Sequence, residues 1–159
     1  MESIDEIDDE GLQQFRRNMQ MIFQDPYESL NPRWTIKDII KEPLDIHNIG
    51  DLKDREEAVI EILKTVGLTP PQNYLSRYPH EISGGQRQRV SIARTLIMKP
   101  KFVICDEPTS MLDVSIRISI MDLMLNLAKE LNVSYLYITH DLAVARYMCN
   151  RIAVMFNGK

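Results

Sequence analysis

Two adjacent acids, Asp106 and Glu107, follow a short apolar run at residues 102–105. A carboxylate at the tip of a buried strand is well placed to hold Mg²⁺ on a nucleotide phosphate, because Mg²⁺ prefers one or two carboxylates together with phosphate oxygens. The neighbouring carboxylate is then free to orient and deprotonate an attacking water. Two solvated acids in a turn explain the pair equally well, so the pair alone does not decide between these readings.

A second candidate begins at Ser83, where the sequence reads Ser83, Gly84, Gly85 and Gln86. Glycines at a helix start leave backbone N–H groups open to an anion, which the helix dipole also favours. Glycine is a poor helix former, so two in a first turn need a reason. A tight connection from loop to helix is the simpler reason, but the arginines that follow at 87, 89 and 94 strengthen the anion-binding reading.

Three further polar residues stand where the predicted elements end. His140 follows the run at 134–139, and a histidine there can hydrogen-bond a terminal phosphate, although a lone histidine is more often structural. Gln24 follows the apolar run at 19–23 and carries no meaning alone. Asp113 lies just beyond the two acids, where it is expected to cap the next helix.

The elements that position these residues follow from apolar periodicity and from capping and breaking residues. Strands are expected at 19–23, 102–105, 134–139 and 152–156, and helices at 9–17, 53–66, 83–98, 114–131 and 142–148. Residues 25–33 and 74–82 are expected to be irregular. Alternating strands and helices predict an α/β fold with a parallel sheet, which binds ligands at the carboxyl ends of its strands.

Composition limits the class of protein. The 159 residues suit one domain, with 44% hydrophobic and 26% charged residues, and a net charge of −4 without a long basic stretch argues against nucleic-acid binding. No apolar run approaches the roughly 18 residues that cross a bilayer. The acidic first residues are expected to form a surface loop and do not look like a signal peptide. Two cysteines match no zinc or disulfide pattern, so a reducing cytoplasm is expected.

In this order and spacing, the motifs resemble the ATPases of the ABC family from about residue 16 to residue 159. The resemblance implies a partial P-loop NTPase (RecA-like) core formed by residues 1–24 and 100–159, with an inserted helical signature subdomain at 25–99. It also implies ATP and Mg²⁺ as ligands. The implied sites comprise Asp106 and Gln24 for Mg²⁺; Glu107, Gln24 and His140 for catalysis; Ser83, Gly84, Gly85 and Gln86 for the ATP of an opposite subunit; and Asp113 at the dimer interface.

Three stretches resemble the ATPases of dipeptide and oligopeptide importers. They are FQDPYESLNPR at 23–33, IIKEPL at 39–44 and RYPHEISGGQRQRVSIAR at 77–94. This subtype implies a head-to-tail homo- or heterodimer of ATPase subunits on two transmembrane permease subunits, served indirectly by a substrate-binding protein. The expected location is peripheral, on the cytoplasmic face of the membrane, with no nucleic-acid partner.

One departure from the family is large. The phosphate loop G-x-x-x-x-G-K-[ST] does not occur among the 159 residues. The chain is therefore expected to be a fragment of the ATPase subunit, without ATP hydrolysis on its own. Ile82 and Met111 also differ from the usual residues but remove no catalytic group.

Two alternatives remain. Soluble ABC ATPases of DNA repair and chromosome structure carry a coiled-coil or zinc insertion, and the segment between Gln24 and Ser83 has no heptads and no cysteines. Translation-type members carry two ATPase modules and a charged linker, which a chain of this length cannot show. A non-catalytic binding or regulatory module of the same fold would have no need for Gln24, Glu107 and His140. An in-frame phosphate loop upstream in the genome would favour the fragment, whereas a stop codon there would favour the non-catalytic module.

Overall fold

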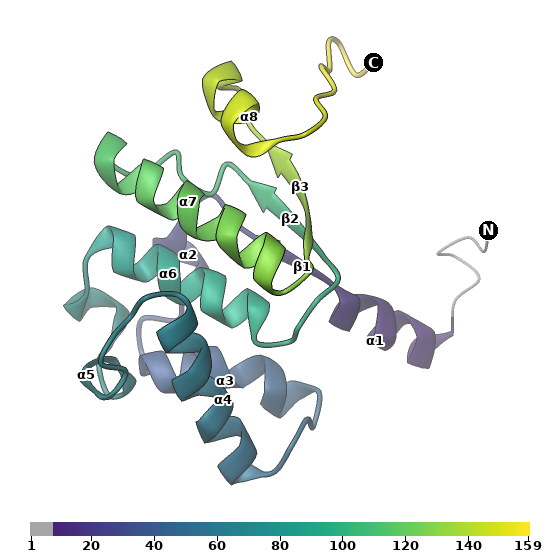
Figure 1. The fold of residues 1–159 in the computed structure, drawn as a ribbon. Helices are drawn as coiled ribbons and strands as arrows, with labels where there is room; N and C mark the ends of the chain where they lie inside the picture. Colours follow the sequence, from purple (N-terminus) through teal and green to yellow (C-terminus); the bar gives the residue numbers. More distant parts are fainter. Residues whose placement is uncertain (1–7) are drawn as a thin grey trace.

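The computed structural model describes residues 8–159, and Figure 1 shows their arrangement. The expected surface loop at the start of the chain therefore lies mostly outside the described residues. The first element is helix α1, Asp9–Asn18, and its N-cap Asp8 accepts a hydrogen bond of 2.8 Å from the Gly11 N–H. The helix predicted at 9–17 is thus confirmed.

Three parallel strands form the sheet, in the order β1-β2-β3. They are β1 (Met19–Ile22), β2 (Phe102–Asp106) and β3 (Ser134–Ile138). Met19 pairs with Phe102, and Phe102 pairs with Ser134, so the three strands start level with one another. The prediction of an α/β fold with a parallel sheet is confirmed.

The two faces of the sheet differ in burial. On one face Ile22, Val103 and Cys105 are completely buried. Helices α6 (Gly84–Leu96) and α7 (Val114–Glu130) contribute to the same core and pack against each other. On the opposite face Leu136 and Ile138 are about half exposed, at 50% and 46%. The helices described here therefore cover only one face well.

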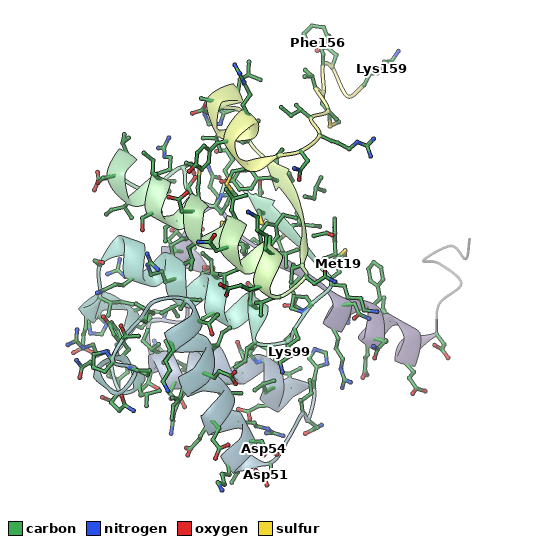
Figure 2. All side chains as sticks on the ribbon, viewed as in Figure 1. Met19, Asp51, Asp54, Lys99, Phe156 and Lys159 are labelled. Atoms are coloured by element: carbon green, nitrogen blue, oxygen red, sulfur yellow. The ribbon has the colours of Figure 1, made fainter. Side chains whose placement is uncertain are left out.

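A group of helices connects β1 to β2 and gathers at one end of the molecule (Figure 1). It comprises α2 (Pro26–Ser29), α3 (Ile36–Ile46), α4 (Leu52–Thr65), α5 (Gln72–Leu75), the 3₁₀ turn η2 (Pro79–Glu81) and α6. The helix predicted at 53–66 is confirmed as α4, and Figure 2 shows Asp51 and Asp54 of its capping box at its first turn.

Three parts of this region differ from the sequence prediction. Helix α3 was not predicted, because Pro43 lies inside it, yet Ile36, Ile39, Ile40 and Leu44 repeat at helical spacing and are buried. The segments expected to be irregular contain the short turns α2, α5 and η2. The predicted division into a core and a helical subdomain at 25–99 stays a prediction.

The last part of the chain holds one confirmed helix and one wrong prediction. Helix α8, Leu142–Met148, forms as expected. Residues 152–156 do not form the predicted strand, and Val154 and Phe156 are 78% and 76% exposed. Figure 2 shows Phe156 far from the sheet. An apolar run becomes a strand only when another backbone pairs with it, and no described strand lies beside this one.

None of the helices between residues 8 and 159 combines the length and apolar character needed to cross a membrane.

Candidate functional site

The ends of the three strands bring the candidate polar residues to one edge of the sheet. Gln24 follows β1 by two residues, Glu107 follows β2 directly and His140 follows β3 by two residues. Since the strands are parallel, their carboxyl ends open on the same side. The predicted meeting of Gln24, Glu107 and His140 is confirmed, and their catalytic roles stay predictions.

The carboxylate of Glu107 lies between the other two side chains. Its Oε2 accepts a hydrogen bond of 3.0 Å from Nε2 of Gln24, and its Oε1 lies 2.5 Å from Nδ1 of His140. The Glu107 side chain is 20% exposed, whereas that of His140 is 80% exposed. A partly sheltered carboxylate is thus held between an amide and an accessible imidazole.

The pKa of His140 is raised above its ordinary value of 6.5. The hydrogen bond to Glu107 is the largest cause and the negative charge of Glu107 is the second, because both favour the protonated imidazole. Asp141 adds to the rise, while Arg117 lowers the pKa. The protonation of His140 therefore reports directly on its contact with Glu107.

The backbone holds Glu107 in an unusual conformation, with φ of 42°. A non-glycine residue in the left-handed region costs about 1–2 kcal/mol, so the neighbouring contacts must compensate. The Glu107 N–H donates to the Ile138 carbonyl at 3.0 Å, and the Glu107 carbonyl accepts from N and Oγ of Ser110 at 3.1 and 3.0 Å. This geometry departs from the strand and turns the side chain toward Gln24 and His140.

The turn that presents His140 is built by its two neighbours. Oγ1 of Thr139 accepts from the Asp141 N–H at 3.1 Å, and Oδ1 of Asp141 accepts from the N–H groups of Ala143 and Val144 at the start of α8. Both side chains are thus used within the turn. His140 is left as the projecting residue between β3 and α8.

The start of α6 has a local explanation. Oγ of Ser83 accepts from the Gln86 N–H at 3.3 Å, and Oε1 of Gln86 accepts from the Ser83 N–H at 3.0 Å. This reciprocal pair is a capping box, which accounts for a serine and a glutamine three residues apart. Ser83 is exposed and Gly84 half-buried.

Gly85 does not face outward as expected from an anion-binding glycine pair. It is buried, and a Cβ at this position would lie 2.7 Å from Cγ2 of Ile116. Glycine is needed here because α6 and α7 approach closely at this point. Gly85 is therefore buried, not outward-facing, and its contact with ATP stays a prediction.

Asp113 does not cap helix α7 through its side chain, although the sequence had predicted that it would. It occupies the N-cap position of α7, but its side chain makes no capping hydrogen bond, and the residue is exposed. The expectation that it caps the helix is therefore wrong as regards the side chain. Its carboxylate faces solvent next to the turn at 110–112.

A sequence profile described as "ABC transporter" matches residues 2–110, which is more than half of the chain. The chain belongs to the ABC transporter family. The order and spacing of the sequence motifs indicate the same family.

Individual relatives agree with this family. The chain is 52% identical over 144 residues to the oligopeptide transport ATP-binding protein AppF of Bacillus subtilis (strain 168), covering 91% of this chain and 43% of AppF. It is 49% identical over 156 residues to the glutathione import ATP-binding protein GsiA of Escherichia coli (strain K12), covering 98% of this chain and 25% of GsiA. The chain spans about half the length of the oligopeptide-transport relatives it matches.

Solved structures show the same fold. The ATP-binding cassette MJ0796, a dimer in a post-hydrolysis state with ADP and Pi, superposes with a TM-score of 0.72 at 32% identity, covering 91% of this chain and 62% of MJ0796. The cbiO1 protein of Clostridium perfringens, part of the ABC transporter complex cbiONQ, gives a TM-score of 0.78 at 29% identity, covering 90% of this chain and 55% of cbiO1. The fold is that of an ABC ATPase cassette.

Two residues at the strand ends have the chemistry to fit the Mg²⁺ that the family resemblance implies. Asp106 ends β2 as a half-buried residue, and Gln24 uses only its Nε2 in the contact with Glu107, so its Oε1 remains an acceptor. Within the described residues, no cluster of three or more His, Cys, Asp or Glu side chains holds a metal. One carboxylate from Asp106 and one amide oxygen from Gln24 suit Mg²⁺ because that ion takes few carboxylates and completes its shell with phosphate oxygens and water.

Three residues near the site were missed by sequence reasoning. Arg117, Thr109 and Tyr137 line a cavity of about 90 Å³ together with Glu107 and His140. The hydroxyls of Thr109 and Tyr137 lie 3.2 Å apart, and burial raises the pKa of Tyr137 to about 12. Of these three residues, only Arg117 has a sequence feature that could have revealed it. A cation in the first turn of a helix opposes the helix dipole.

Proposed function

We propose that this protein is the ATP-hydrolysing subunit of an ABC importer for oligopeptides or dipeptides, and that it couples ATP hydrolysis to substrate transport. The family and fold support the ATPase, and the names of the relatives at about half-identity support peptide import. The observation that carries the proposal is the contact of Glu107 with both Gln24 and His140 at the strand ends.

Glu107 is the proposed general base. Gln24 and His140 each contact one of its carboxylate oxygens, so an attacking water must compete with them for the carboxylate lone pairs. His140 is exposed and projects from its turn, so a γ-phosphate can compete with Glu107 for its imidazole. In this proposal nucleotide binding frees Oε1 of Glu107 at the moment the substrate arrives.

Asp106 and Gln24 are the proposed ligands of Mg²⁺. Bound there, the ion would neutralise charge on the phosphates of the nucleotide. Gln24 joins this position to the base, because its amide nitrogen already holds Glu107. Its segment continues into α2, and we assign this segment the contact with the permease subunits.

The surface around Ser83, Gly84 and Gln86 is the proposed contact for ATP held by a second ATPase subunit. Ser83 is exposed, and the dipole of α6, a helix of 13 residues, ends there. Gly85 supports this contact indirectly by allowing α6 to approach α7. Asp113, exposed and not used as a cap, is the proposed residue that crosses to the second subunit.

The phosphate loop remains to be supplied by residues outside these 159, since its pattern does not occur among them. The proposal therefore assigns hydrolysis to the subunit in its complete form, working as a head-to-tail dimer on two permease subunits at the cytoplasmic face of the membrane. The 159 residues alone are expected to show no ATP turnover.

The test is peptide uptake by the organism that carries the gene. Replacing Glu107→Gln removes the base and should lower uptake of a labelled tripeptide by about 10²–10⁴-fold, the usual contribution of general base catalysis. Glu57→Gln is the matched control, since Glu57 is an exposed carboxylate on α4 far along the chain from the site.

Unchanged uptake of both the labelled tripeptide and glutathione in the Glu107→Gln strain would refute the proposed role of Glu107. Loss of uptake of another solute, with peptide uptake intact, would refute the peptide assignment and keep the ATPase. Glutathione uptake is measured in parallel, because one relative is a glutathione importer.

A further inference from the structure

Arg117 is placed where a structural arginine has little reason to be. It is the fourth residue of α7, and its own N–H donates to the Asp113 carbonyl at 2.8 Å. A positive side chain in the first helical turn faces the positive end of the helix dipole. An interaction beyond the helix must therefore account for this position.

The guanidinium of Arg117 reaches back over the turn that follows Glu107. Its Nη2 donates to the carbonyls of Ser110 and Leu112 at 3.4 and 3.3 Å. The same turn donates to Glu107, whose carbonyl accepts hydrogen bonds from both N and Oγ of Ser110. Arg117 thus contacts the segment that holds the left-handed backbone of Glu107 in place.

The hydrogen bonding of Arg117 is incomplete. Its two contacts are long, and its Nε is buried with no hydrogen-bond partner among the described residues. Buried arginines normally satisfy their donors, because an unmet donor loses its hydration without compensation. Local hydrogen bonding alone therefore explains the side chain poorly.

Arg117 also lines the cavity at the candidate site. Among the described residues that line the cavity of about 90 Å³, Arg117 is the one arginine or lysine, and Glu107 and His140 line the same cavity. Three charged groups act on His140, each from a different element: Glu107 after β2, Asp141 before α8 and Arg117 on α7. The two carboxylates favour the imidazolium, and Arg117 opposes it.

We propose that Arg117 is a positioning residue for Glu107 and His140: it ties the turn at 110–112 to α7 and places a fixed positive charge that keeps the Glu107–His140 contact open to exchange. Without this charge the two residues would close into a tighter ion pair, and the base would be harder to release. This role rests on the proposed function of Glu107 and His140, but its physical effects are measurable without nucleotide.

The experiment compares the wild-type 159-residue chain with Arg117→Gln and Arg117→Lys by NMR. In Arg117→Gln the pKa of His140 should rise, and the amide protons of Ser110 and Leu112 should exchange on the order of tenfold faster, as expected for the loss of a net hydrogen bond. Arg117→Lys keeps the positive charge but loses the planar guanidinium with its several donors. Amide exchange at Ser110 and Leu112 should therefore be faster, while the pKa of His140 stays near that of the wild type.

Arg146→Gln is the matched control, because Arg146 is an exposed arginine on α8, close to His140 in sequence, that does not act on its pKa. It should change neither readout. If Arg117→Gln does not fold, Arg117→Lys provides the test on its own. Unchanged amide exchange at Ser110 and Leu112 in that variant, or a His140 pKa that differs from the wild type, would overturn the proposal.

In a folded Arg117→Gln, a His140 pKa equal to that of the wild type would overturn the proposal as well. Failure of the proposed function has a different signature, namely normal peptide uptake in the Glu107→Gln strain with the NMR shifts of Arg117→Gln still present.

Discussion

The start of α6 and the Glu107 site are both sequence motifs, but they are held in different ways. Ser83 and Gln86 bond to each other across three residues. Glu107 is held by Gln24, 83 residues away, and by His140, 33 residues away. The first motif is completed by its own helix, and the second only by the folded sheet.

This difference bears on how each motif supports a function. The capping box and the contact with Ile116 account for the serine, the glutamine and one glycine without any ligand. The left-handed backbone of Glu107 and the raised pKa of His140 have no comparable structural benefit. Local packing and capping thus explain the start of α6, whereas Glu107 and His140 need a functional explanation.

The largest effect on stability is expected from Gly85→Ala. Its Cβ would lie 2.7 Å from Cγ2 of Ile116, and overpacking of this kind costs about 1–3 kcal/mol. Urea unfolding measures the loss, and adding Ile116→Ala should recover part of it as a coupling energy. If Gly85→Ala is as stable as the wild type, close packing of α6 on α7 is not the reason for the glycine. That result would favour anion binding by the backbone N–H groups at the start of α6.

A smaller effect is expected at the two N-cap positions. Ser83→Ala should lower the free energy of unfolding by about 1 kcal/mol, because it removes a capping hydrogen bond. Asp113→Ala, at the same position of α7, should change it by less than about 0.5 kcal/mol, because its side chain makes no such bond. Equal losses in the two variants would contradict the difference between a helix start capped by its side chain, at α6, and one without such a cap, at α7.

The smallest effect is a pH dependence that distinguishes two histidines. The folded-state pKa of His140 is raised, so its stabilising contribution is complete below the unfolded value of 6.5 and is lost as pH rises through the folded value. The pKa of His47 is lowered, first by burial and then by Arg17, so its contribution is present above 6.5 and is lost as pH falls.

Urea unfolding of His140→Gln and His47→Gln at about pH 5 and pH 8 tests these signs. For His140→Gln, the loss in the free energy of unfolding relative to the wild type should be larger at about pH 5 than at about pH 8. A His140→Gln variant whose difference grows from pH 5 to pH 8 would show that the contact with Glu107 is not formed in solution.

Some parts of the fold were predictable because their signals are local. Helix α4 has apolar residues on one face, an aspartate cap and Gly67 with φ of 76° at its end. Helix α3 was missed because a proline inside a segment, here Pro43, argues against a helix. The helical spacing of its isoleucines becomes clear only from their burial in the structure. The strand predicted at 152–156 failed because apolar content cannot supply a pairing partner.

At the candidate site, residue types and order were predictable and geometry was not. Parallel strands bring their ends to one edge, so the meeting of Gln24, Glu107 and His140 follows from the sequence pattern. The positive φ of Glu107 has no residue-type signal, since glycine and asparagine are the usual residues there. Arg117 was missed because only the folded turn places it beside Glu107.

The amino-acid sequence alone established the family, the parallel sheet and the residues at the strand ends, because these depend on periodicity and on side-chain types near one another in the chain. Tertiary structure decided that Gly85 is buried against Ile116, that Asp113 leaves its carboxylate free of a capping bond and that Glu107 is shared by Gln24 and His140. These features depend on distances between side chains far apart in sequence, and such distances are set only when the helices and strands pack together.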